Sequence, residues 1–227
     1  MMTPFQSGPD YGEPITLALL ETWARGWALT RGIAPPVRDK GGLRIDVGWP
    51  EQKTRYIFKG LTEGLLQLAC TIVEPYVFIK ICLPAAAVKQ YLPPRWSISE
   101  PRFLMTSSQS TKTTARALPE GYILSIDESP SLAVVKILTV AGDLAAIGRI
   151  AIVDNHAIYD RIETSPGHRR KGLATAVMQT LEDIAVHRNR NKGILVATAQ
   201  GRALYETLGW QVRSDYTTTV ILPGALQ

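Results

Sequence analysis

One short run of the chain, Arg169-Arg-Lys-Gly172-Leu-Ala174, combines residue types that are typical of a phosphate site. It follows a Pro-Gly turn and opens an apolar helical pattern. Three basic side chains supply positive charge, Gly172 lets a ligand approach the backbone, and Ala174 keeps the next turn small. The first N–H groups of a helix have no partner inside it and attract phosphate. The run therefore predicts a turn that binds a phosphate or pyrophosphate group.

The surroundings of this run carry most of the excess charge of the chain. The formal net charge is +5, and between Arg161 and Lys192 there are seven basic residues and three acidic ones. Such a basic field attracts either a phosphorylated small molecule or a nucleic acid. A nucleic-acid surface also needs interleaved aromatic residues, and none lies in this stretch. The pattern favours a small phosphorylated ligand over a nucleic-acid partner.

The run must be positioned by a strand before it and a helix after it. The helix is predicted over residues 169–187, where Leu173, Val177, Leu181 and Ile184 recur on one face. Further along, Gly209 closes a short helix. Strand and turn patterns predict these other elements: strands 121–127, 132–140, 144–153, 156–164, 194–197, 210–212 and 217–222, and helix 201–208.

Three features of this half resemble the GNAT superfamily of N-acetyltransferases. The run Arg169 to Ala174 matches the family's cofactor motif, which is Arg or Gln, two residues, Gly, one residue, and Gly or Ala. The strand ending at Thr164 resembles the family's fourth strand. Ala203-Leu-Tyr205-Glu-Thr-Leu-Gly209-Trp is similar to its Leu-Tyr-x-x-x-Gly-Phe signature. The resemblance covers about residues 121–222 and implies an α+β, GNAT-like acyltransferase fold with a central mixed sheet flanked by helices.

The same resemblance implies acetyl-CoA as the acetyl donor and a primary amine as the acceptor. The backbone of Ile162 and Thr164 would pair with the pantetheine arm, and the Thr164 N–H would hold the developing oxyanion. Tyr205 would protonate the departing thiolate as a general acid. The implied acetyl-CoA contacts are Ile162, Thr164, Arg169, Arg170, Lys171, Gly172, Leu173, Ala174 and Thr175.

The acceptor arrives as an ammonium ion and must lose a proton, so a base is needed. Asp160 and Glu163 are the nearest carboxylates, three positions apart on one expected strand. Residues at that spacing point to opposite faces unless a bulge intervenes. Both therefore stand as candidate bases. The sequence departs from the family pattern at two nearby positions. Thr198 stands where many members have Asn, and Gly201 stands where Ala is usual. Gln200 could substitute for the Asn in contacting the cofactor.

The N-terminal region carries no motif of this kind. Ile15, Leu19, Trp23 and Trp27 recur every four residues and predict a helix ending near Gly32. Strands 43–47, 55–58, 76–83 and 102–105 and helices 61–72 and 85–92 are also expected. The polar run 106–114 is the expected linker, so residues 1–115 form an additional α+β region and 116–227 the GNAT domain. The order strand, helix, strand from residue 76 echoes the end of the chain, which leaves a degenerate GNAT-like copy open.

Other classes of protein are weighed against this interpretation. A GNAT-like module that binds acetyl-CoA or regulates without turnover is the main alternative. The three histidines pair with no cysteine at metal-ligand spacing, so no metal is expected. The apolar stretches are too short to span a membrane, and the N-terminus shows no secretory signal, so a cytoplasmic location is expected. A homodimer is left open.

Overall fold

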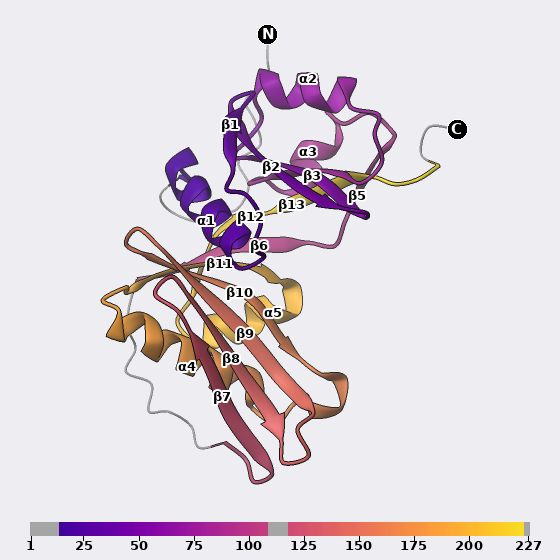
Figure 1. The fold of residues 1–227 in the computed structure, drawn as a ribbon. Helices are drawn as coiled ribbons and strands as arrows, with labels where there is room; N and C mark the ends of the chain where they lie inside the picture. Colours follow the sequence, from indigo (N-terminus) through magenta and orange to yellow (C-terminus); the bar gives the residue numbers. More distant parts are fainter. Residues whose placement is uncertain (1–13, 109–117, 225–227) are drawn as a thin grey trace.

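The computed structural model describes residues 14–108 and 118–224, which form two mixed sheets and five α-helices. Helix α1 (Leu17–Leu29) lies between the two sheets, and one strand from each half of the chain belongs to the sheet of the other half (Figure 1). This arrangement confirms the α+β class. Within the described residues, no helix is both long and apolar enough to cross a membrane.

The C-terminal half contains the larger sheet. Its strands follow the order β12-β6-β11-β10-β9-β8-β7. The sheet begins as an antiparallel meander, and α4 then carries the chain back so that β11 runs parallel to β10. The elements of this half are β7 (Tyr122–Glu128), β8 (Leu132–Thr139), β9 (Leu144–Val153), β10 (His156–Thr164), α4 (Leu173–His187), β11 (Lys192–Thr198), α5 (Ala199–Thr207), β12 (Gln211–Asp215) and β13 (Thr217–Ile221).

The N-terminal half builds the second sheet, in the order β1-β2-β3-β4-β13-β5. Here α2 makes the crossover between the parallel strands β3 and β4. The elements of this half are α1 (Leu17–Leu29), β1 (Val37–Asp39), β2 (Gly42–Trp49), β3 (Gln52–Phe58), α2 (Glu63–Thr71), β4 (Val77–Ile81), α3 (Ala85–Lys89), β5 (Trp96–Ile98) and β6 (Arg102–Ser107).

The two sheets exchange one strand each. β6, the last strand of the N-terminal half, lies between β11 and β12 and is antiparallel to both. β13, the last strand of the chain, lies between β4 and β5 and is again antiparallel to both. The order and direction of pairing are therefore the same in the two sheets. A cut between residues 115 and 116 would separate each exchanged strand from the sheet that contains it.

Helix α1 packs between the halves. Its buried residues share one apolar core with β2, β10 and the linking residue Tyr216. It approaches β10 closely at Gly26, where an added Cβ would lie 2.3 Å from Cγ1 of Ile158. On the opposite face of the larger sheet, α4 packs just as closely against Gly148, where a Cβ would lie 2.4 Å from Cγ1 of Val177. The larger sheet is therefore covered on both faces.

The structure corrects three details of the expectation from sequence. The helix expected from residue 169 begins at Leu173, because Arg170 and Gly172 have φ angles of 61° and 76°, outside the helical region. Thr106 and Ser107, expected in a linker, belong to β6 and pair with β11. The rest of the expected linker, from residue 109 on, lies outside the described residues. The three-residue strands β1 and β5 were not expected.

Candidate active site

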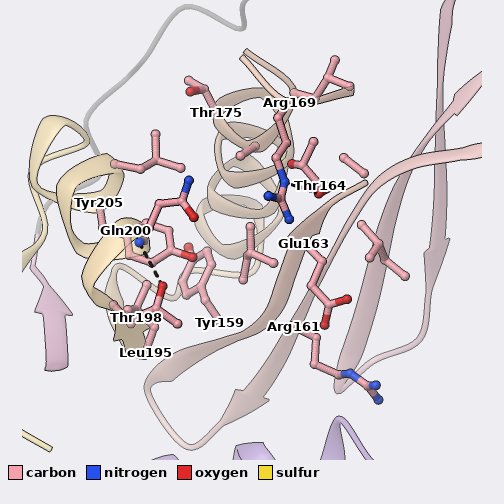
Figure 2. A pocket seen from close by; sticks show the side chains of 18 of the residues that line it. Tyr159, Arg161, Glu163, Thr164, Arg169, Thr175, Leu195, Thr198, Gln200 and Tyr205 are labelled. Carbon is pink, nitrogen blue, oxygen red and sulfur yellow. Dashed lines mark hydrogen bonds between the residues drawn. The ribbon is translucent and has the colours of Figure 1, made fainter. Parts of the chain in front are cut away.

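A cavity of about 1170 Å³ opens where β10 separates from β11. The two strands pair only from His156 with Lys192 to Ile158 with Ile194, and beyond that point β10 has a free edge. The cavity is lined by β10, the loop that leads into α4, and α5. Figure 2 shows Tyr205 and Gln200 on the α5 side and Thr164, Glu163 and Arg169 on the β10 side. All the expected acetyl-CoA and catalytic residues except Lys171 line it.

A β-bulge decides how the two candidate carboxylates point. Asp160 pairs with Arg149 and Glu163 with Ile147, so two residues of β10 lie opposite Gly148 alone. Because Ile147 and Arg149 are two residues apart on β9, their side chains point to the same face of the sheet. Asp160 and Glu163 therefore also share that face, which is the face that α1 covers.

The two carboxylates have different surroundings. Asp160 forms an ion pair with Arg31, and the two side chains are 16% and 13% exposed. It also accepts a hydrogen bond of 2.7 Å from the Thr30 hydroxyl. Glu163 is exposed to the cavity and has no ion pair with another described residue. Glu163 is therefore the carboxylate whose oxygens are free to accept a proton from a ligand.

The start of α4 presents N–H groups to the cavity. Its N-cap is Gly172, and within the described part of the chain no side chain caps the helix. Each of α1, α2 and α5 is instead capped by a threonine hydroxyl, from Thr16, Thr62 and Thr198. The N–H groups of the first turn of α4 are left for a ligand, and no acidic residue lies in that turn to repel an anion.

The three basic residues before α4 point in different directions. Arg169 and Arg170 line the cavity, and Arg169 Nε donates to the Thr164 carbonyl at 3.3 Å. Lys171 lies outside the cavity, and its Nζ donates a hydrogen bond to the Tyr122 hydroxyl at 3.0 Å. Two of the three cations therefore face the uncapped helix start.

Tyr205 lies on α5 at the wall opposite Glu163. The side chain is 7% exposed and its ring packs beside Trp210, with ring centroids 6.2 Å apart. Burial, and then the negative charge of Asp160, raise the pKa of Tyr205 to about 12. Within residues 14–108 and 118–224, no other residue forms a hydrogen bond with its hydroxyl. The phenol is thus a protonated donor at the cavity wall.

Residues 99–210 match the model of the acetyltransferase (GNAT) family. This segment is a GNAT acetyltransferase domain. Among curated proteins, none matches the sequence of the chain.

Solved GNAT structures have the same fold over most of the chain. A GCN5-related N-acetyltransferase from Kribbella flavida is 14% identical, with a TM-score of 0.60 over 89% of this chain and 94% of its own. A GNAT-family acetyltransferase from Novosphingobium aromaticivorans is 16% identical, with a TM-score of 0.54 over 88% and 95%. A tandem GNAT protein from the clavulanic acid biosynthesis pathway is 13% identical, with a TM-score of 0.50 over 65% of each chain.

The departures from the GNAT pattern have a local structural role. Thr198, which stands where many members have Asn, accepts a 3.1 Å hydrogen bond from the Gly201 N–H and so caps α5. An added Cβ at Gly201 would lie 3.2 Å from the ring of Tyr205. Gln200 also lines the cavity, and its contact with a cofactor stays a prediction. The cap and the glycine together set the position of the Tyr205 ring.

The GNAT motifs do not account for three cavity residues. Tyr159 is buried on β10 with its ring 5.0 Å from that of Trp210. Burial and the carboxylates of α4 raise its pKa above its usual value. Arg31 and Arg102 come from the N-terminal half. No local sequence signal marks these arginines, because the chain fold alone brings them to the cavity.

Proposed function

We propose that the protein transfers the acetyl group of acetyl-CoA directly to a primary amine. The observation that carries this proposal is the free edge of β10 beside the uncapped start of α4. An extended pantetheine arm can pair with such an edge as an added strand does. A pyrophosphate can then accept hydrogen bonds from the first N–H groups of α4, with Arg169 and Arg170 as countercharges.

The residues present fit this donor. The Oγ1 atom of Thr164 is buried and has no hydrogen-bond partner among the described residues, so it can form a hydrogen bond with a polar group of the donor. The backbone N–H of the same residue is our candidate donor to the oxyanion that forms when the amine attacks the thioester carbonyl. One such donor contributes roughly 10²–10³ in rate. No protein nucleophile is required, because the amine itself attacks.

Two side chains divide the proton transfers. Glu163 accepts a proton from the acceptor ammonium, directly or through one water, because its carboxylate is exposed to the cavity and forms no ion pair with the other residues that the structure describes. Asp160 is paired with Arg31 and accepts a hydrogen bond from Thr30, so it is not our candidate base. Tyr205 donates its phenolic proton to the departing thiolate of coenzyme A, a role that contributes about 10²–10⁴ in rate.

Binding and turnover are tested separately. We expect coenzyme A and acetyl-CoA to raise the melting temperature, by a shift that corresponds to about 2.7 kcal/mol at a hundredfold excess over Kd. An Arg169→Ala/Arg170→Ala variant should lose most of this shift, whereas Lys192→Ala, an exposed charge outside the cavity, should keep it. No shift in the native protein would contradict the donor site.

Turnover is measured as thiol release from acetyl-CoA over a panel of primary amines. We expect release with at least one amine. Binding of acetyl-CoA without release with any amine would instead favour a GNAT-fold module that binds the donor and does not catalyse transfer.

A further inference from the structure

The part of the cavity on the α1 face of β10 is walled by guanidinium groups. Arg31 follows α1, Arg102 begins β6, and Arg161 lies in the bulge. Arg31 is engaged with Asp160. Arg102 is half-buried, and no hydrogen bond or ion pair joins its guanidinium to another of the described residues. A guanidinium without a partner at a cavity wall is a ready site for an anion.

More positive charge is buried behind Arg102. Arg55 and Lys80, on neighbouring strands of the smaller sheet, are 8% and 6% exposed. The Arg55 guanidinium lies over the Trp27 ring, 3.8 Å from its centroid, and Lys80 donates to the Thr218 hydroxyl at 3.0 Å. Neither forms an ion pair with a carboxylate in the described part of the chain. Buried charge without a counterion is costly, so this cluster favours an incoming anion.

The electrostatics agree with this geometry. Burial lowers the pKa of Lys80 well below its usual value, and the positive charges of Arg55 and Arg102 lower it further. Burial also lowers the pKa of Arg55 to about 10. Among the described residues, Asp160 is the carboxylate whose charge raises the pKa of Arg55, and Asp160 is already paired with Arg31. An anion beside Arg102 would relieve the mutual repulsion of these cations.

We propose that the acceptor of the transfer carries an anionic group, a carboxylate or a phosphate, in addition to its amine, and that Arg102 binds this group. The inference rests on the proposed function and names the class of acceptor. Arg102 pairs through its backbone with Thr198 on the α5 side, whereas Glu163 lies on the β10 side. The acceptor would lie across the cavity, with its ammonium at Glu163 and its anion at Arg102. Polyamines and other polycations are disfavoured.

Amines of matched length test the acceptor class. We compare kcat/KM for hexylamine, 6-aminohexanoate and 1,6-diaminohexane, and for ethanolamine and phosphoethanolamine, at constant ionic strength. We expect at least one anionic amine to exceed its neutral partner by tenfold or more, and the two pairs separate a carboxylate from a phosphate. A higher kcat/KM for the diamine than for 6-aminohexanoate, with no preference for phosphoethanolamine, would overturn the proposal.

Substitution of Arg102 tests the residue. Arg102→Met should lower the ratio of kcat/KM for the anionic and neutral amines by about 10- to 100-fold, because a hydrogen bond between charged groups is lost. Arg102→Lys should restore part of the ratio. The matched control is Arg38→Met, since the Arg38 side chain is 68% exposed and lies outside the cavity. An unchanged ratio in Arg102→Met would reject the assignment.

A binding measurement tests the anion site without turnover. Inorganic phosphate is titrated into the protein saturated with coenzyme A, so that the start of α4 is occupied, and into the Arg169→Ala/Arg170→Ala variant. A rise in melting temperature that disappears in Arg102→Met and persists in Arg38→Met supports the site. An equal rise in melting temperature in Arg102→Met and Arg38→Met overturns the anion site. If coenzyme A itself gives no shift, the proposed function fails, while the phosphate result in the double variant still decides the anion site.

Discussion

At the scale of single residues, Tyr205 and Glu163 lie on opposite walls of the cavity and are our proposed general acid and general base. Burial holds the Tyr205 proton, with a pKa of about 12. We expect Tyr205→Phe to reduce single-turnover thiol release about 10- to 10³-fold, because the ring stays and the proton is lost. Calorimetric titration should give a nearly unchanged Kd for acetyl-CoA. Equal rates in the two proteins would end the general-acid assignment.

The same pKa predicts the pH dependence of turnover. Tyr205 remains the acid form at every pH well below about 12, so its own ionisation removes no activity between pH 6 and 10. The rate should rise with pH as the acceptor loses its proton and then level off. The check is a pH profile of kcat over that range. A fall above pH 8 that is absent in Tyr205→Phe would contradict the raised pKa.

The sequence located the cavity residues of β10, the start of α4 and α5, and missed the arginines that the N-terminal half supplies. The basic run and the Tyr205 signature are local patterns, and both line the cavity. The choice between Asp160 and Glu163 stayed open because the bulge at Arg161, with φ of 52°, leaves no mark in an alternating strand pattern. No sequence motif marks Arg102 as a cavity residue. It reaches the cavity because β6, which contains it, pairs with β11 of the other half.

At the scale of elements, α1 is fixed on the sheet by the close approach at Gly26. A Cβ there would meet the Ile158 side chain at 2.3 Å. We expect Gly26→Ala to destabilise the protein by about 1 kcal/mol or more in urea unfolding, because overpacking outweighs the gain in helix propensity. Combining it with Ile158→Ala should give a loss smaller than the sum of the two.

A control for this substitution is Gly60→Ala, where an added Cβ meets no atom within 4 Å. We expect it to change the free energy of unfolding only slightly. A neutral or stabilising Gly26→Ala would show that α1 can move away from β10, and with it the Arg31 side chain that holds Asp160.

Helix α4 contains a carboxylate whose surroundings predict a pH effect on stability. Partial burial, and then the charge of Asp183, raise the pKa of Glu182 to about 7. The folded state therefore binds more protons than the unfolded state between about pH 4.5 and 7, and stability falls as the pH rises through that range. We expect the melting temperature of Glu182→Gln, relative to the native protein, to increase from pH 5 to pH 8. A constant difference would contradict the raised pKa.

At the scale of the whole molecule, the two sheets repeat one plan. We infer that the N-terminal half is a second GNAT-like copy without a donor site. Its parallel strands β3 and β4 pair up to Phe58, the last residue of β3, so no free edge opens, and Thr62 caps α2. The echo of strand and helix order in the sequence suggested such a copy. The exchange of β6 and β13 could not be predicted, because the order of strands along the sequence does not show which sheet each strand joins.

This exchange predicts how fragments behave. Residues 1–115 alone lack β13, which separates β4 from β5, and residues 116–227 alone lack β6. We expect neither fragment to unfold cooperatively by itself, whereas the two expressed together should copurify and show one thermal transition. The measurement is calorimetry of each fragment and of the pair. A cooperative transition in residues 1–115 alone would contradict the dependence on β13.

The exchange also sets the timing of folding during synthesis. β13 (Thr217–Ile221) follows every other strand of both sheets in the chain, so the ribosome delivers it after all of them. Domains ordinarily fold as units, the N-terminal one first. Here the smaller sheet must wait for β13, with the facing edges of β4 and β5 unpaired until then. While β7 to β12 are synthesised, the nascent N-terminal half therefore presents two open strand edges, which are ready templates for pairing with other chains.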